Sequence, residues 1–297
     1  LFRSESLAID GEELVRLQAL FDQAVGSILP KISFKGSYTR QDDHGVSSSG
    51  SLSSFTLKDR TEYKFTLKQP IFSGLKEFYA LRQTSALASA QENDLRHAKL
   101  LLFSDAAQAF YGVLQAERAL ATTEDSLRLG RERLEELGQR QKAGLSRRSE
   151  VLAQEAEVAS IEAQIEELKG VLAVAWETLQ FLTGVSQTRL LTDTFADPGE
   201  VPGVESYLTR AMAARKDVEA FRHRIAAAEE GVAVARSGWF PTLTLDANYY
   251  THRAGVSKEI DWDVLLSLEA PIFDGFTTSA RMREAASYLR TARLQLA

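Results

Sequence analysis

Two long stretches of the chain, on either side of a turn at residues 142–146, carry apolar or small residues at alternating steps of four and three. These residues are Leu102, Ala106, Ala109, Val113, Ala116, Leu120, Thr123, Leu127, Gly130, Leu134 and Leu137 before the turn, and Val158, Ile161, Ile165, Leu168, Leu172, Ala175, Leu179 and Leu182 after it. A sustained 3.5-residue period is the seam of a coiled coil, because only that period keeps one stripe against a partner as two helices supercoil. The pattern therefore predicts an antiparallel helical hairpin, with helices over 75–142 and 149–183.

The turn between these helices carries its own signals. Gly144 can adopt a positive φ and end the first helix, and Ser149 followed by Glu150 is typical of the N-cap of the second. At 1.5 Å per residue, the first helix of about 68 residues would be roughly 100 Å long. The shorter helices predicted at 12–28 and 149–183 together match that length. We therefore expect a wall of paired helices, which is a cylinder rather than a compact domain.

The same order of elements occurs twice in the chain: helix, proline, strand, loop, strand, Pro-Ile-Phe-x-Gly, long helix. Apart from the long helices, the predicted elements cover 12–28, 31–39 and 62–68 in the first copy and 205–236, 242–249 and 262–268 in the second. The two Pro-Ile-Phe motifs lie 201 residues apart, far beyond solenoid periods, so the sequence predicts a duplicated half. The helix–strand junctions are assigned to Pro30, Pro70, Gly74, Pro241, Pro271 and Gly275. By this symmetry we expect a second coiled hairpin beyond Ala297, and we interpret the start at Leu1 as that of a processed form or fragment.

Each predicted strand alternates apolar and polar residues over about ten positions, the length that crosses a bilayer at a tilt near 45°. The alternative is a half-buried strand in a soluble sheet. The bilayer interpretation is favoured because the strands are predicted as two isolated hairpins, which are marginal in water, and because the helices are too long to cover a small sheet. Four strands cannot close a barrel, so several chains would share one. The predicted lipid-facing positions are Ile32, Phe34, Tyr63, Phe65, Leu67, Leu243, Leu245, Val264, Leu266 and Leu268.

Composition and motifs give no sign of catalysis. The chain has no cysteine and a net charge of −6, which argues against thiolate chemistry and against nucleic acid as a partner. No run of 18–20 apolar residues predicts a transmembrane helix, and no signal peptide or phosphate-binding loop is found. His44, His97, His223 and His252 lack metal-ligand spacing, and Glu135-Glu136 and Glu166-Glu167 are expected on solvated helix faces. We expect no metal, no cofactor and no enzyme activity.

Essentially the whole chain resembles the TolC-like outer-membrane efflux protein family, also called outer membrane factors. The resemblance is carried by the order of five motifs: Leu29-Pro30-Lys31-Ile32-Ser33, Gln69-Pro70-Ile71-Phe72-Ser73-Gly74, Ala143-Gly144-Leu145 followed by Ser149-Glu150-Val151, Ala211 through Val218, and Phe240-Pro241-Thr242-Leu243. The family often has a proline where this chain has Lys216, and that difference is expected to alter only the start of a helical turn.

The resemblance implies a mixed α and β fold: a trimer in which each chain gives four strands to a shared 12-stranded outer-membrane β-barrel and coiled-coil helical hairpins to a periplasmic tunnel. It implies three kinds of partner besides the other two chains, namely a periplasmic adaptor protein, an inner-membrane pump and outer-membrane lipid. The adaptor would dock at the turn formed by Ala143, Gly144, Leu145 and Ser146. A gating acidic ring, which some members carry on the second hairpin, has no counterpart in this sequence.

The predicted organisation is a periplasmic helix at 1–29, a barrel hairpin at 30–72, the long helical hairpin at 73–183, an irregular equatorial segment at 184–204, a periplasmic helix at 205–240, a second barrel hairpin at 241–273 and the start of a second long helix at 274–297. The predicted function is an outer-membrane exit duct of a tripartite efflux or type I secretion system in a Gram-negative bacterium. The alternative is a soluble coiled-coil scaffold or adaptor that binds a partner through its hairpin tip. Detergent dependence separates the two.

Overall fold

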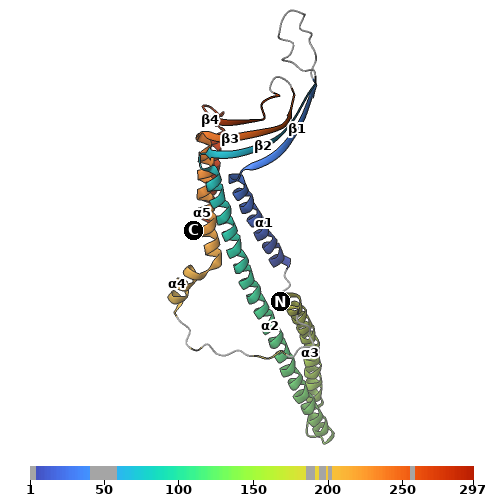
Figure 1. Ribbon diagram of the computed structural model, residues 1–297. Helices are drawn as coiled ribbons and strands as arrows, with labels where there is room; N and C mark the ends of the chain where they lie inside the picture. The colour runs from blue at the N-terminus through green and yellow to red at the C-terminus, as the bar shows by residue number, and fades with distance from the viewer. Residues whose placement is uncertain (1–4, 41–58, 185–190, 194–198, 200–202, 255–257) are drawn as a thin grey trace, which may run out of the picture. The chain divides into compact units, whose positions relative to one another are not determined.

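The computed structural model describes residues 5–40, 59–184, 191–193, 199, 203–254 and 258–297 (Figure 1). The described chain forms two compact units. The first combines the described residues of 1–9 with those of 95–214, and the second combines those of 10–94 with those of 215–297. The long helix α2 (Lys76–Lys142) contributes residues to both units.

The first unit is built on the helical hairpin of α2 and α3 (Arg148–Thr183). The predicted seam is confirmed, because all of its positions are buried or half-buried while most of their neighbours are exposed. Val113, Trp176 and Leu179 form the core of the hairpin, with exposed fractions of 0%, 7% and 3%. At 67 residues in one uninterrupted helix, α2 has almost the predicted length.

The start of α3 differs from the prediction. The helix begins at Arg148 with Arg147 as N-cap, so the assignment of Ser149 as N-cap was wrong. The Glu150 carboxylate accepts hydrogen bonds from the Arg147 backbone N–H, at 3.3 Å, and from the Ser146 hydroxyl. This carboxylate satisfies a free backbone donor from inside the first turn, and a capping Ser149 is therefore unnecessary. At the other end, Gly184 closes α3 with a φ of 71°.

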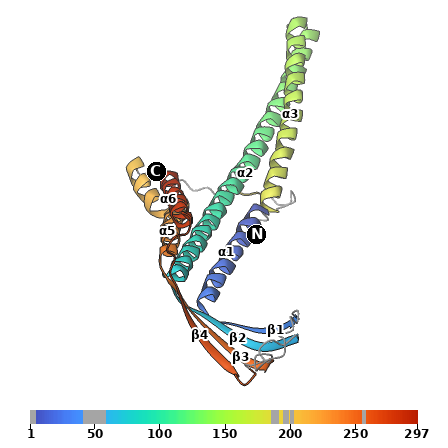
Figure 2. The ribbon, with the colours of Figure 1, turned by 90° about the horizontal axis from the view of Figure 1, so that it is seen from above.

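The second unit contains one four-stranded antiparallel sheet in the order β1-β2-β3-β4 (Figure 2). Its strands are β1 (Lys31–Arg40), β2 (Asp59–Ser73), β3 (Thr242–Arg253) and β4 (Trp262–Glu269). The prediction of two isolated hairpins was wrong, because β2 pairs with β3 over eleven positions and joins the two halves of the repeat. The loop predicted at 41–54 lies outside the described residues.

Strand β2 is longer than predicted. It continues through Pro70 to Ser73, although the sequence indicated that it stops at Pro70. Proline has no N–H to give to a ladder, and the register with β3 shifts between Pro70 and Phe72. The strand therefore passes its proline at an irregularity in the pairing.

The described part of this unit also contains α5 (Lys216–Arg236), α6 (Thr277–Leu296) and the short 3-10 helix η1 (Ser237–Trp239). It further contains α1 (Glu5–Ile28) from Asp10 onward and the first residues of α2. Arg82 of α2 forms an ion pair with Glu230 of α5 at 2.9 Å, and Arg293 of α6 forms one with Glu229 at 2.8 Å. The start of α1 lies seven residues before the predicted Glu12. Its apolar pattern is weak in this first part, so periodicity alone missed it.

The helix predicted over 205–236 is two helices, α4 (Val204–Ala214) and α5. Arg215 separates them with an extended ψ of 122° and serves as the N-cap of α5. The Arg215 guanidinium donates to the Asp217 carboxylate, which also accepts the Val218 backbone N–H at 2.9 Å. Negative charge at a helix start is favourable, and Asp217 therefore stabilises a new start here. The departure from the family motif at Arg215-Lys216 falls at this break.

Candidate functional site: a two-faced sheet and an exposed hairpin turn

The sheet of the second unit has one apolar face. Strand pairing places Phe34 opposite Phe65 on β1 and β2, Phe65 opposite Tyr249 on β3, and Tyr249 opposite Trp262 on β4. The side chains of a strand alternate between the two faces of the sheet, so the residues two positions before and after each of these paired residues lie on the same face. All ten positions predicted to face lipid lie on this one face: Ile32, Phe34, Tyr63, Phe65, Leu67, Leu243, Leu245, Val264, Leu266 and Leu268.

These apolar side chains are largely exposed in the chain as described. Ile32, Phe34 and Leu266 are 72%, 58% and 60% exposed. Phe34 packs against the ring of Phe65 at 5.2 Å between centroids. The two rings cover part of each other, and the rest of their surface is exposed. An apolar face of this kind is unfavourable in water and marks a surface that meets a membrane or another protein.

Aromatic residues border the apolar face at both ends of the sheet. At the end away from the helices lie Tyr38, Tyr63, Tyr249 and Trp262, all of them exposed. At the helical end lie Phe72, Trp239, Phe240, Phe273 and Phe276, also exposed. The nine residue steps from Phe240 to Tyr249 span about 30 Å of strand, or about 21 Å across a bilayer at a tilt of 45°. Membrane barrels carry aromatic girdles about 25 Å apart, so the two borders have suitable spacing.

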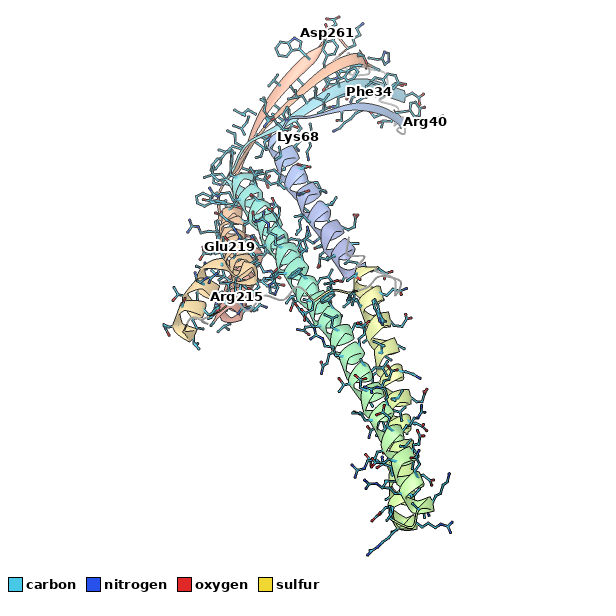
Figure 3. The ribbon with its side chains drawn as sticks, turned by 90° about the horizontal axis from the view of Figure 1, so that it is seen from below. Phe34, Arg40, Lys68, Arg215, Glu219 and Asp261 are labelled. Carbon is cyan, nitrogen blue, oxygen red and sulfur yellow. The ribbon has the colours of Figure 1, made fainter. Side chains whose placement is uncertain are left out.

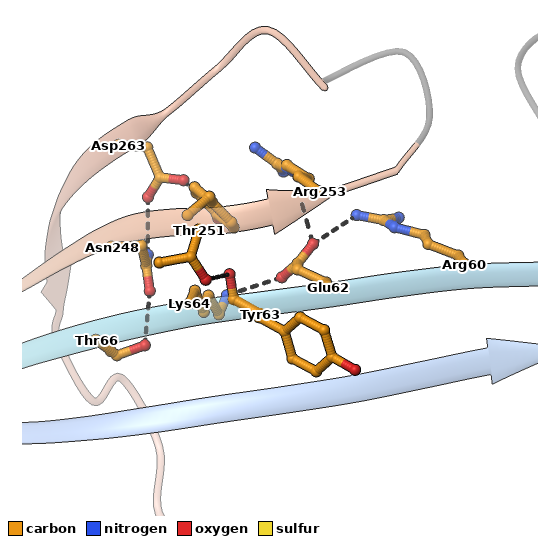
Figure 4. Close-up of polar contacts among 10 residues, drawn as sticks. Arg60, Glu62, Tyr63, Lys64, Thr66, Asn248, Thr251, Arg253 and Asp263 are labelled. Atoms are coloured by element: carbon orange, nitrogen blue, oxygen red, sulfur yellow. Dashed lines mark hydrogen bonds and ion pairs between the residues drawn. The ribbon is translucent and has the colours of Figure 1, made fainter.

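The opposite face of the sheet is polar, and its centre is a chain of hydrogen bonds across three strands (Figure 4). The Thr66 hydroxyl donates to the Asn248 side-chain oxygen at 2.9 Å, and the Asn248 amide donates to Asp263 at 2.8 Å. The Tyr250 hydroxyl donates to the second Asp263 oxygen at 2.7 Å. Thr66 and Tyr250 are buried, so these bonds satisfy polar groups that water does not reach freely.

A second group on the polar face gathers around one carboxylate. The Glu62 carboxylate forms ion pairs with Arg60 at 2.9 Å, Lys64 at 3.3 Å and Arg253 at 3.6 Å. Lys64 and Arg253 also lie over the Tyr250 ring, 5.2 Å and 4.1 Å from its centroid. Three cations around a single anion leave this cluster positively charged. Sequence alternation placed Glu62 and Lys64 on one face, whereas Arg253 was predicted to lie in a loop at 251–259. Arg253 reaches this face because the register with β2 shifts between Tyr63 and Lys64.

The helix–strand junctions repeat one backbone conformation. Gly74 and Leu75 have φ angles of 65° and 62°, and Gly275 and Phe276 have φ angles of 65° and 67°. A side chain at Gly74 would also meet the segment before β3, because a Cβ there would lie 2.8 Å from both the Phe240 Cβ and the Ser237 carbonyl oxygen. Of the other predicted junction residues, Pro30 and Pro241 lie directly before β1 and β3, and Pro271 lies between β4 and α6. The assignment of Pro70 as a junction was wrong, because it lies inside β2, which continues to Ser73.

In the first unit, the turn of the helical hairpin is an exposed Schellman motif. The Leu145 N–H donates to the Arg140 carbonyl at 2.8 Å, the Gly144 N–H donates to the Gln141 carbonyl at 3.0 Å, and Gly144 has a φ of 75°. In this motif the residue after the glycine normally packs on an apolar residue of the last helical turn. Here that turn carries Gln139 and Arg140, and Leu145 is 80% exposed.

Hydrogen bonding also affects the protonation of Glu150, the carboxyl group next to the turn. The Ser146 hydroxyl, followed by the Arg147 backbone N–H, donates to the Glu150 carboxylate and lowers the pKa of that group. Glu150 is therefore a carboxylate at neutral pH and fixes the start of α3. The turn thus presents a short, rigid backbone with Leu145 outward.

Among the described residues, no group of three or more acidic, histidine or cysteine side chains is arranged to hold a metal ion. His97, His223 and His252 lie far apart in the sequence, and His44 lies outside the described residues. No described helix combines the length and apolar character needed to span a membrane.

Comparison with known proteins finds one matching family. The model of the family described as "Outer membrane efflux protein" matches residues 6–185 and 207–297. A curated relative, the pyoverdine export outer membrane protein OpmQ of Pseudomonas putida, is 31% identical over 200 residues, which make up 64% of this chain and 42% of the relative. The chain therefore spans less than half the length of this relative.

Solved structures share the fold. The Vibrio cholerae outer membrane protein VceC superposes with a TM-score of 0.82 at 19% identity, over 99% of this chain and 72% of VceC. CusC, a transmembrane channel protein, superposes with a TM-score of 0.82 at 18% identity, over 98% of this chain and 68% of CusC. At these identities the likeness concerns the fold, namely helical hairpins joined to barrel strands.

Proposed function

The chain belongs to the outer membrane efflux protein family, and on that premise we propose that it forms an outer-membrane exit duct for an efflux or type I secretion system. Three copies would join their sheets into one 12-stranded barrel, with the apolar faces toward lipid and the polar faces toward a water-filled lumen. The chain itself would catalyse no reaction. Localisation in the outer membrane follows from the family.

The single observation that carries this proposal is the division of the sheet into two faces. Strand register brings apolar residues from all four strands onto one exposed face and hydrogen-bonded polar groups onto the other. A soluble scaffold would have to cover that apolar face, since four strands of exposed leucine, isoleucine and aromatic side chains favour aggregation in water. A bilayer covers it without any further protein.

The test is extraction and conduction by the full-length protein. We expect it to remain in the outer-membrane fraction until detergent is added, to migrate as a cross-linked trimer and to conduct ions in a planar bilayer. Dispersion without detergent as a monomer that conducts no ions would overturn the duct and favour the soluble scaffold.

We further propose that the turn at Ala143, Gly144, Leu145 and Ser146 docks on a periplasmic adaptor that connects the duct to an inner-membrane pump. Its support is the outward Leu145 on a backbone fixed by Gly144 and Glu150. Leu145→Ser should abolish adaptor binding while conduction by the purified duct stays unchanged. Equal adaptor binding by this variant would contradict docking at the turn. Pyoverdine is one cargo to test, because the Pseudomonas putida relative is described as its exporter.

A further inference from the structure

Two pairs of lysines face each other directly on the polar side of the sheet. Strand pairing places Lys31 opposite Lys68 and Lys35 opposite Lys64. The two pairs, which we call the lysine rungs, are four residues apart on β1 and lie on one face, about 13 Å from each other along the strands. Figure 3 shows Lys68 at the end of the sheet near α1, and Arg40 at the opposite end.

This arrangement costs stability unless something compensates for it, because like charges directly opposite each other in a sheet repel. Within the described residues, the carboxylate that forms an ion pair with a rung is Glu62, which contacts Lys64 at 3.3 Å and also holds Arg60 and Arg253. Lys31, Lys35 and Lys68 are exposed, and no ion pair within 4.0 Å is found for them in the described part of the chain. Lys31, Lys35 and Lys68 therefore carry positive charge outside any ion pair of the described residues, with Asp246 of β3 opposite Lys68 in the register.

The polar face as a whole also carries an excess of positive charge. By strand register this face carries six basic side chains, Lys31, Lys35, Arg60, Lys64, Lys68 and Arg253, and four acidic ones, Glu62, Asp246, Asp263 and Glu269. The excess is two positive charges per chain, although the chain as a whole has a net charge of −6. The basic residues are concentrated on β1 and β2, and three of the four acidic residues lie on β3 and β4.

We propose that the lysine rungs attract anions and that the duct passes anionic solutes, such as those bearing carboxylates, in preference to cations. This inference rests on the proposed function, because it requires the polar face to line a water-filled lumen. Charges of one sign on low-dielectric walls concentrate ions of the opposite sign, and rings of lysine or arginine select anions in membrane pores. Passage of anions would account for the presence of lysine pairs that repel each other within the sheet.

Reversal potential in a planar bilayer tests the inference. The full-length protein is reconstituted in uncharged lipid across a KCl gradient, and the permeability ratio of chloride to potassium is measured. We expect the double variant Lys31→Gln, Lys35→Gln to lower this ratio by a factor on the order of ten relative to the wild-type protein. The double variant Lys31→Arg, Lys35→Arg should keep the wild-type ratio.

Arg40→Gln is the matched control, because Arg40 is on the same strand but on the apolar side of the sheet. It should leave the ratio unchanged. A ratio that is equal in the wild-type protein and the Lys→Gln variant would overturn the inference while leaving the duct intact. Equal ratios together with a less stable trimer would overturn it as well, and would assign Lys31 and Lys35 to ion pairs with a neighbouring copy. Failure of the wild-type protein to conduct at all would instead overturn the proposed duct.

Discussion

Leu75 and Phe276 adopt the same left-handed conformation 201 residues apart, with φ angles of 62° and 67°. Among the described residues, these two are the non-glycine positions with positive φ. Each follows a glycine of matching φ at the start of a helix, so the two halves of the repeat share one strained turn between strand and helix. The repeat therefore preserves backbone geometry as well as sequence.

The two glycines of these turns should respond differently to the same substitution. Gly74→Ala and Gly275→Ala both place a Cβ at a φ of 65°, which should cost about 1 kcal/mol. At Gly74 the new Cβ would also meet Phe240 and Ser237, whereas at Gly275 it would meet nothing within 4 Å. Overlap of that kind typically adds about 1–3 kcal/mol. Thermal unfolding in detergent should show a larger loss for Gly74→Ala, and equal losses would contradict the crowding at this junction.

Asn248 joins three strands, so its removal should weaken the sheet. Asn248→Ala leaves the Thr66 hydroxyl without its acceptor and Asp263 without one donor, at a cost of about 1–3 kcal/mol. Ser33→Ala, which removes an exposed hydroxyl from the same face, should change stability little. Chaotrope-induced unfolding in micelles measures both variants. If they are equally stable, the hydrogen bonds of Asn248 carry no net stability.

Gly130 lies on the coiled-coil seam and has room for a methyl group. An added Cβ would lie 3.5 Å from the Val158 Cγ2, which is an ordinary contact distance. Alanine in a helix is favoured over glycine by about 0.5–1 kcal/mol, so Gly130→Ala should raise the unfolding temperature. Gly138→Ala is the control for the backbone effect alone, because nothing lies within 4 Å of its Cβ position. A loss of stability at Gly130 alone would mean that the seam needs a glycine for close packing.

The hairpin turn should loosen in acid. Hydrogen bonds from the Ser146 hydroxyl and the Arg147 N–H hold the pKa of Glu150 below its ordinary value. A lowered pKa contributes stability above the unfolded-state value, near 4.3, and this contribution is lost as pH falls through the folded-state value. Hydrogen exchange, corrected for its intrinsic pH dependence, should therefore show falling protection at Arg147 below about pH 4. Glu150→Gln should remove this dependence, and its persistence in the variant would assign it to another group.

The helices and strands could be predicted from the sequence because their apolar side chains recur at the periods of a helix and of a strand. The 3.5-residue seam from Leu102 to Leu182 and the alternation around Phe34 and Leu266 both follow from which side chains avoid water. Gly144 was assigned correctly because only its positive φ ends the helix with the observed hydrogen bonds. Trp262 and Tyr249 lie in the same alternation, and the same pattern would have placed them on the apolar face.

Features that depend on contacts between distant residues could not be predicted. The pairing of β2 with β3 brings Thr66 to Asn248, 182 positions away, and no local pattern encodes that register. The break at Arg215 depends on an ion pair with Asp217 and an extended ψ, and periodicity continues smoothly across it. The N-cap of α3 was misplaced because Glu150 does the work expected of Ser149. In each case, a side chain forms a hydrogen bond with a backbone or polar group, and residue preferences do not indicate which side chain will do so.

Site-specific labelling of β1 tests most directly whether the sheet has lipid on one side and water on the other. Residues 1–297 contain no cysteine, so single cysteines at positions 32–35 are the labelling sites in this segment, and any cysteine elsewhere in the full-length protein is replaced by serine. In proteoliposomes of the full-length protein, labels at Ile32 and Phe34 should be quenched by nitroxide-bearing lipid, and labels at Ser33 and Lys35 by aqueous iodide. Iodide quenching at all four positions, or lipid quenching at Ser33 and Lys35, would contradict a membrane barrel with a polar lumen.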